Sequence, residues 1–335
     1  MSKASFCGSH VKIKVIGLGG TGCNTITRMV REDIRGVEFI AMNTDSQSLE
    51  LTEAPVRHQL GRIITKGMGA GGNHELGRKA AEENRDEIAA LVTDTDLVFI
   101  TCGMGGGTGT GSAPIVGEIA RKAGALTIAV VSKPFAFEGR HRSEVADQGI
   151  AALLGKVDSL VVVPNDRLLE LNDQRLGIDE AFLVSDRLLK QGIQVIAEVL
   201  NTPGIINLDF ADIKAILKDS GSAFMSIGIG RGPNRSLEAA QAALTSPLMD
   251  VPVAGANGIL FNIVGSDTLT LHEVNEAAEF IRRVATPEAN IIFGVAYHPS
   301  IQPNEVKITL IATGFASPGA VSGPKAVSHS VIEAP

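Results

Sequence analysis

The chain has 335 residues, more than one hydrophobic core usually serves, so we expect two packed units. With 44% hydrophobic and 20% charged residues it is neither a disordered chain nor a coiled coil, and its net charge of −7 argues against a general nucleic-acid binder. Glycine is in excess, at 37 residues or about 11% against a usual value of about 7%, whereas aromatic residues make up only 4%. This composition favours a protein that contacts a ligand or a partner through its backbone rather than through aromatic side chains.

The first half of the chain alternates apolar runs with amphipathic patterns, after an N-terminal stretch, 1–10, that we expect to be flexible. The predicted strands are short and β-branched, and they cover 11–17, 37–43, 96–102, 126–132 and 159–165. One of the helical patterns between them runs from Leu76 to Leu91. Strand–helix alternation predicts a mostly parallel sheet with helices on both faces and ligands at the carboxyl ends of the strands. We therefore predict a Rossmann-like domain over 11–177.

A long helix is predicted over 178–202, because the apolar periodicity continues until Pro203 stops it. It leads into a second α/β unit over 203–316 and is expected to pack between the two units. That unit has predicted helices at 210–218, 236–244 and 271–284, and predicted strands at 222–230, 258–264, 290–297 and 305–313. The tail, 317–335, is small, polar and proline-bearing, so we expect it to be disordered.

The cysteines and the N-terminus indicate a cytoplasmic protein. Cys7, Cys23 and Cys102 are odd in number and show no CxxC spacing, which favours a reduced compartment, and MSKASFCGSH has no apolar core of a signal peptide. The uncharged stretch between Asp96 and Glu118 contains too many glycines for a membrane-spanning helix.

The sequence contains three glycine-rich loops, two of which directly follow predicted strands. The first, GLGGTG (17–22), satisfies GxGxxG and by itself fits a turn without a ligand or a dinucleotide fingerprint with Asp45 as the ribose acid. The others are GMGAGGN (67–73) and GMGGGTGTG (103–111), and both open helices. Three such loops favour a run of phosphates, because successive N–H groups at helix N-termini bind anions. None contains GxxxxGK[ST], so this is not a Walker P-loop protein.

GMGGGTGTG, together with NTD (43–45), PFAFEGRHR (134–142) and NLDFAD (207–212), closely resembles the FtsZ family, the tubulin-like GTPases of bacterial cell division. The resemblance implies the tubulin/FtsZ fold: an α/β, Rossmann-like parallel-sheet GTPase domain, a long central helix and a smaller second α/β domain. It also implies GTP or GDP as ligand, with Mg²⁺ bound mainly through the phosphates and no dedicated metal-ligating side chains. The family usually has an unbroken glycine run where this chain has Thr21, which bears on affinity rather than on binding mode.

The resemblance implies nucleotide contacts in each motif, with Phe182 stacking on the base and Asp186 accepting the guanine N1–H and N2–H₂ donors. Without the resemblance, Phe182 would be a core residue, Asp186 a surface residue, and Glu138 with Arg142 a solvated pair on one helical turn. The implied contact residues are Gly20, Thr21, Gly22, Cys23, Asn24, Asn43, Ala70, Gly71, Gly72, Gly103, Gly106, Gly107, Thr108, Gly109, Glu138, Arg142, Asn165, Phe182 and Asp186. Cys23 and Cys102 border two of the loops, and their own chemistry favours small buried thiols.

An acidic loop precedes the predicted helix 210–218. From spacing alone, Asp209 caps that helix and Asp212 complements its dipole. The resemblance implies a catalytic role instead: the loop docks on the nucleotide of the next subunit, where Asp209 and Asp212 orient the attacking water and Asn207 positions the loop. A head-to-tail contact that does not close generates a filament.

The resemblance further implies a cytoplasmic filament that forms the cytokinetic ring at mid-cell, with membrane-anchoring and regulatory division proteins as partners and neither nucleic-acid binding nor direct membrane insertion. The ending VSHSVIEAP is not a convincing version of the family's anchor-binding peptide. Two alternatives stay open. One is an FtsZ-like paralogue acting as a GTP-regulated scaffold outside division, and the other is an NAD-dependent oxidoreductase, which leaves the loop at 103–111 unexplained.

Overall fold

The computed structural model describes residues 11–32, 34, 36–171, 177–201, 205–206, 208–246, 253–298 and 301–315. The expectations of a flexible stretch at 1–10 and a disordered tail at 317–335 lie outside these residues, as does Asn207.

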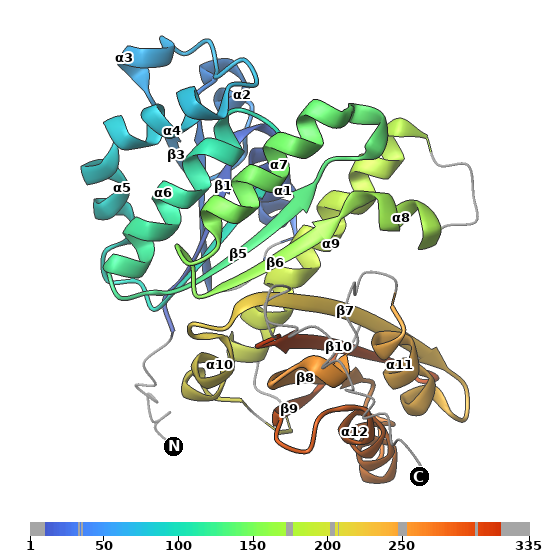
Figure 1. Cartoon of the computed structure of the whole chain (residues 1–335). Helices are drawn as coiled ribbons and strands as arrows, with labels where there is room; N and C mark the ends of the chain where they lie inside the picture. Colours follow the sequence, from blue (N-terminus) through green and yellow to red (C-terminus); the bar gives the residue numbers. More distant parts are fainter. Residues whose placement is uncertain are drawn as a thin grey trace, which may run out of the picture.

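The described strands form one ten-stranded sheet in the order β3-β2-β1-β4-β5-β6-β7-β10-β8-β9 (Figure 1). The N-terminal strands pair in parallel: β1 (Ile13–Leu18), β2 (Val37–Asn43), β3 (Val56–Gln59), β4 (Leu97–Gly103), β5 (Leu126–Lys133) and β6 (Ser159–Pro164). In the C-terminal part, β10 (Glu305–Thr313) is antiparallel to β7 (Gly221–Arg231) and to β8 (Gly258–Gly265), which pairs in parallel with β9 (Asn290–Tyr297). The predicted mostly parallel sheet is confirmed for the first half.

A short parallel contact between β6 and β7 joins the two halves into this one sheet. The paired residues are Ser159 with Gly221, Leu160 with Ser222, and Val161 with Ala223. The buried Asp158, just before β6, supports the junction: its carboxylate accepts a hydrogen bond from the Thr127 amide at 2.8 Å and its carbonyl accepts one from the Gly221 amide at 3.0 Å. The two α/β units that the sequence predicts therefore share a continuous backbone hydrogen-bond network.

Helices cover both faces of the N-terminal part of the sheet, because alternate strand residues point to opposite sides. One core joins strand residues such as Val15 and Phe99 to α1 (Gly19–Arg31) and α9 (Ile178–Asn201). The other joins residues such as Ile16 and Ile100 to helices on the opposite face. Those helices are α4 (His74–Glu83), α5 (Arg85–Val92), α6 (Thr108–Lys122) and α7 (Arg140–Leu153).

The long helix α9 matches the predicted central helix and packs between the two halves (Figure 1). Its buried residues Leu189 and Ile193 share one core with Val15 of the first half and with Met225 and Ile311 of the second. A separate core lies between β8, β10 and the helices α11 (Arg235–Leu244) and α12 (Leu271–Val284), while α10 (Phe210–Leu217) packs on the shared core.

Short elements differ most from the sequence prediction. The single helical pattern from Leu76 to Leu91 is wrong: α4 and α5 are separate helices that break at Asn84, whose side-chain oxygen accepts from the Gly61 amide at 2.8 Å. The short elements that the sequence did not predict are β3, α2 (Ser46–Glu50), α3 (Arg62–Thr65), α8 (Asn165–Leu171) and the short 3₁₀ helices at Ala136–Glu138 and Val253–Gly255, and the longer α7 was not predicted either. Four- and five-residue elements carry too few residues for a recognisable period.

Candidate functional site

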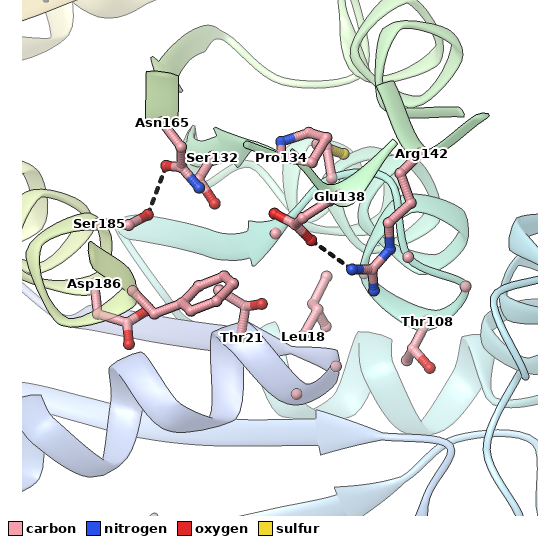
Figure 2. Close-up of a pocket in the computed structure, with 18 residues that line it drawn as sticks. Leu18, Thr21, Thr108, Ser132, Pro134, Glu138, Arg142, Asn165, Ser185 and Asp186 are labelled. Carbon is pink, nitrogen blue, oxygen red and sulfur yellow. Dashed lines mark hydrogen bonds and ion pairs between the residues drawn. The ribbon is translucent and has the colours of Figure 1, made fainter. Parts of the chain in front are cut away.

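A cavity of about 230 Å³ lies at the carboxyl ends of the parallel strands, where the sequence predicts the ligand site (Figure 2). Its walls come from the first and third glycine loops, from the segment after β5, and from α8 and α9. The lining residues are Leu18, Gly19, Gly20, Thr21, Gly103, Met104, Gly106, Gly107, Thr108, Gly109, Ser132, Pro134, Glu138, Arg142, Asn165, Phe182, Ser185 and Asp186.

Two long helices, α1 and α6, begin at this cavity with free N-termini. Within the described residues, no side chain caps either helix, and neither has an acidic residue in its first turn. By contrast, α4 is capped by Asn73 and α12 by a reciprocal box with Thr270. The first-turn N–H groups of α1 and α6 are therefore left for a ligand, and both helix dipoles favour an anion there.

Close packing explains most glycines of the loop at 103–111, whereas all four glycines of the loop at 67–73 have a positive φ, between 56° and 82°. Between 103 and 111 only Gly105 has a positive φ, of 95°. A Cβ on Gly107 would lie 2.8 Å from the Ala70 Cβ, and one on Gly22 would lie 2.5 Å from the Thr101 carbonyl oxygen. The glycines thus let α1 approach β4 and let the loop at 67–73 lie directly on the loop at 103–111.

Hydroxyl groups tie the loops together. The Thr44 and Thr108 hydroxyls, both buried, share a hydrogen bond of 2.6 Å, which connects the loop after β2 with the start of α6. The Thr21 side chain, the departure from the family's glycine run, lies over Gly103: a Cβ on Gly103 would be 2.7 Å from the Thr21 Oγ1. Gly103 has no side chain, so Thr21 fits without displacing the loop.

The opposite end of the cavity carries a half-exposed ring and three buried polar side chains. Phe182 of α9 contacts Phe135 edge-on, with ring centroids 5.4 Å apart. Asn165 lies at the start of α8, and its side-chain oxygen accepts a hydrogen bond of 2.7 Å from the Ser185 hydroxyl (Figure 2). Asp186 follows Ser185 on α9. A flat ring next to donor and acceptor groups suits a nucleobase.

Asp186 is held by two residues of α1. Its carboxylate lies 3.0 Å from the Arg28 guanidinium and accepts a hydrogen bond of 3.2 Å from the Thr25 hydroxyl. Burial raises the pKa of Asp186 to about 6, although Arg28 and Thr25 act in the opposite direction. The helix that begins at the first glycine loop, α1, therefore also orients the Asp186 carboxylate and favours its ionised form.

Glu138 and Arg142 form an ion pair at the cavity wall. The prediction that they share one helical turn is wrong: Glu138 ends a 3₁₀ helix, Arg142 lies in α7, and Gly139 separates them with a φ of 99°. Glu138 also accepts a hydrogen bond of 2.9 Å from the Phe135 amide. The cation of Arg142 thus faces the cavity from a fixed position.

Most of the predicted contact residues line the cavity, and the others lie behind or beside it. The second group is Gly22, Cys23, Asn24, Asn43, Ala70, Gly71 and Gly72. Cys23 and Cys102 are the buried thiols that the sequence favours, and burial raises their pKa values to about 11 and about 12. Gly71 and Gly72 are exposed and have open space where side chains would stand. They follow Ala70, which packs on Gly107.

Six lining residues are absent from the predicted contact set: Leu18, Gly19, Met104, Ser132, Pro134 and Ser185. Ser132 and Pro134 follow an apolar strand core, so the rule that ligands bind at carboxyl ends of strands could have found them. Ser185 had no such signal, because only the fold brings it next to Asn165, 20 residues away.

The acidic residues of the predicted catalytic loop do not line the cavity. Asp209 and Asp212 form the helix cap that their spacing predicts, since each carboxylate accepts a hydrogen bond from the other's amide, at 2.8 and 3.2 Å. Nearby, the exposed Ile205 and Ile206 donate backbone hydrogen bonds to Val295 of β9. Within one chain, the structure does not bring these carboxylates together with the cavity.

The described part of the chain contains no cluster of three or more His, Cys, Asp or Glu side chains placed to hold a metal ion. None of the described helices is both long enough and apolar enough to cross a membrane.

Comparison with known proteins agrees with this architecture. Residues 12–173 match the model of the Tubulin/FtsZ family, GTPase domain, and residues 221–316 match that of the FtsZ family, C-terminal domain. A solved structure of an FtsZ dimer from M. jannaschii is 43% identical, with a TM-score of 0.87, over 91% of this chain and 89% of that chain. A mutant of the M. jannaschii protein is also 43% identical, with a TM-score of 0.88, over 92% of each chain.

A more distant likeness shows the fold alone. CetZ1 from Haloferax volcanii, solved as a GDP-bound monomer, is 20% identical, with a TM-score of 0.79, over 91% of this chain and 95% of that chain. The two family models and the M. jannaschii structures define a tubulin-like GTPase. The chain belongs to the FtsZ family.

Proposed function

We propose that this protein binds GTP in the cavity and hydrolyses it where two copies meet head to tail, in a cytoplasmic filament that forms the division ring at mid-cell. The observation that carries the nucleotide assignment is the pair of uncapped N-termini, of α1 and α6, that open onto one cavity. Family membership makes GTP the expected ligand. The two FtsZ structures compared above come from M. jannaschii, so the proposal does not depend on a bacterial host.

The proposed contacts follow the shape of the cavity. The phosphates lie on the first turns of α1 and α6, with Arg142 as the facing cation, and the exposed Gly71 and Gly72 approach the γ-phosphate. The base lies against Phe182 and donates to Asp186. Mg²⁺ is held mainly by phosphate oxygens, as is usual for this ion in nucleotide sites, and it neutralises charge on the phosphates when bound.

A site divided between two copies accounts for the separation of the carboxylates from the cavity. Phosphoryl transfer needs positioned charges and an oriented water rather than covalent chemistry, so Asp209 and Asp212 of one copy can serve the nucleotide of the next. The M. jannaschii relative was solved as a dimer, which supports self-association here. Asn207, outside the described residues, would position the same loop.

The substitution Asp212→Asn tests the catalytic role. An asparagine oxygen can still accept the hydrogen bond from the Asp209 amide, so α10 is expected to keep its cap. We expect GTP binding and assembly to persist while hydrolysis falls by about 100-fold or more. The matched control is Asp94→Asn, an exposed carboxylate at the amino end of β4. Equal hydrolysis by both variants, or loss of GTP binding in Asp212→Asn, would contradict the role.

Dilution tests the divided site independently. GTPase activity per subunit is expected to fall steeply below a critical protein concentration, measured together with light scattering in the presence of GTP and Mg²⁺. Activity strictly proportional to concentration would indicate a self-contained enzyme. A protein that assembles with GTP but never hydrolyses it would instead support the scaffold alternative.

A further inference from the structure

We propose that Ser185 is a positioning residue for nucleobase recognition: its hydroxyl fixes the Asn165 amide so that the NH₂ group faces the base. This inference rests on the proposed function, since it concerns how the same cavity selects its nucleotide. Ser185 itself has no part in the phosphate contacts or in hydrolysis.

The geometry of the pair is specific. The Ser185 hydroxyl donates to the Asn165 side-chain oxygen at 2.7 Å, and the two residues are only 2% and 4% exposed. Figure 2 shows the amide oxygen of Asn165 turned toward Ser185 and the amide nitrogen turned toward the interior of the cavity. Both residues line the cavity, so the orientation of this one amide decides which group a ligand meets.

The remaining hydrogen-bonding capacity of Asn165 points to a ligand. An asparagine amide has an acceptor at its oxygen and two donors at its nitrogen. Among the described residues, the oxygen accepts from Ser185, which leaves the nitrogen as the group of Asn165 that can serve a ligand in the cavity. A ligand that covers this nitrogen has to supply an acceptor, because a donor buried without a partner is costly. Asn165 is therefore presented as a donor.

Asp186, the next residue on α9, supplies the complementary group. Its carboxylate is an acceptor, and Arg28 and Thr25 hold it from the side of α1. The base end of the cavity thus offers one fixed donor and one fixed acceptor next to the Phe182 ring. Guanine has acceptors at O6, N7 and N3 and donors at N1 and N2, so it can satisfy both groups. A base without an acceptor in reach of Asn165 leaves the buried donor unpaired.

The test combines a substitution in the protein with changes to the base, in the manner of a double-mutant cycle. Dissociation constants are measured below the assembly concentration for GTP, 3-deaza-GTP, 7-deaza-GTP and 6-thio-GTP, with the wild type and Ser185→Ala. We expect Ser185→Ala to weaken GTP binding about fivefold. In the wild type one of the three analogues, the one in which the acceptor facing Asn165 is removed or replaced by the weaker acceptor sulfur, binds more weakly than GTP. That loss shrinks at least threefold in Ser185→Ala, since Asn165 is no longer held.

Two further variants separate positioning from packing. Ser226→Ala removes another buried hydroxyl, on β7, that has no hydrogen-bond partner in the described structure and lies outside the cavity, and it is expected to leave all four affinities unchanged. Ser185→Cys keeps a weak donor and is expected to fall between the wild type and Ser185→Ala. If Ser185→Ala weakens all four nucleotides by the same factor, Ser185 is structural only and the inference is overturned. A wild type that binds no GTP would refute the proposed function instead.

Discussion

Acidification is expected to weaken GTP binding through a single carboxylate, Asp186. In the proposed site the base donates to this carboxylate, which must therefore be ionised. Burial raises the pKa of Asp186 to about 6, whereas the nearby charge of Arg28, 3.0 Å away, lowers it. Lys190, one turn further along α9, is paired with Glu32, whereas the Arg28 guanidinium lies against the Asp186 carboxylate and is the charge that acts on it.

The expected magnitude follows from the pKa of about 6. The ionised fraction of Asp186 is about 0.9 at pH 7 and about 0.1 at pH 5, so affinity falls about tenfold between them. An aspartate with an ordinary pKa of about 3.9 would lose almost nothing over this interval. Replacing Arg28 with Met removes an interaction that typically lowers a carboxyl pKa by about one unit or more, which places the midpoint of the variant near pH 7. At pH 6 it then binds GTP about fivefold more weakly than the wild type, and the two converge above about pH 8.

The assay is equilibrium titration with a fluorescent GTP analogue at about pH 5 to 9, below the assembly concentration. The nucleotide phosphates also titrate in this range, but their contribution is the same for wild type and Arg28→Met and cancels in the ratio of affinities. Asp186→Asn, which cannot titrate, gives the phosphate contribution alone. A ratio that stays constant with pH, or a wild-type midpoint near pH 4, would refute the proposed charge coupling.

Two substitutions outside the cavity test the packing that supports it. Gly111→Ala places a Cβ against the His74 carbonyl of α4, so we expect the free energy of unfolding to fall by about 1–3 kcal/mol in urea titrations, whereas Gly177→Ala, which has open space, should change little. Arg235→Met removes a buried cation and leaves the partly buried Glu273 carboxylate without its partner, so it is expected to cost about 3 kcal/mol near neutral pH. The partner arginine lowers the pKa of Glu273 to about 2, so this contribution is present above the ordinary pKa of about 4.5 and disappears as the pH falls toward 2. The hydrogen bonds of Arg235 to the Thr268 and Pro303 carbonyls are lost at every pH, so only the Glu273 part of the deficit disappears. A deficit as large in acid as at neutral pH would contradict this assignment.

Local periodicity in the sequence determined the regular elements of this protein. The apolar runs that become β2, β5, β9 and β10 and the long pattern that becomes α9 lie within a residue or two of their predicted bounds. Their order also determined a mostly parallel sheet in the first half, because strand–helix alternation leaves few other arrangements. The glycine loops placed the ligand site at the carboxyl edge for the same reason. These features depend on neighbours in the chain, which a sequence displays directly.

Only the tertiary structure decided how the cavity is assembled. The sequence did not indicate that β6 and β7 would join the two predicted units into one sheet, or that Gly107 would pack on Ala70. It also offered no reason to pair Ser185 with Asn165 or Arg28 with Asp186. Each of these contacts joins residues far apart in the chain. Their formation depends on how whole helices pack across the sheet, and a burial pattern read along one segment carries no information about the partner that covers it.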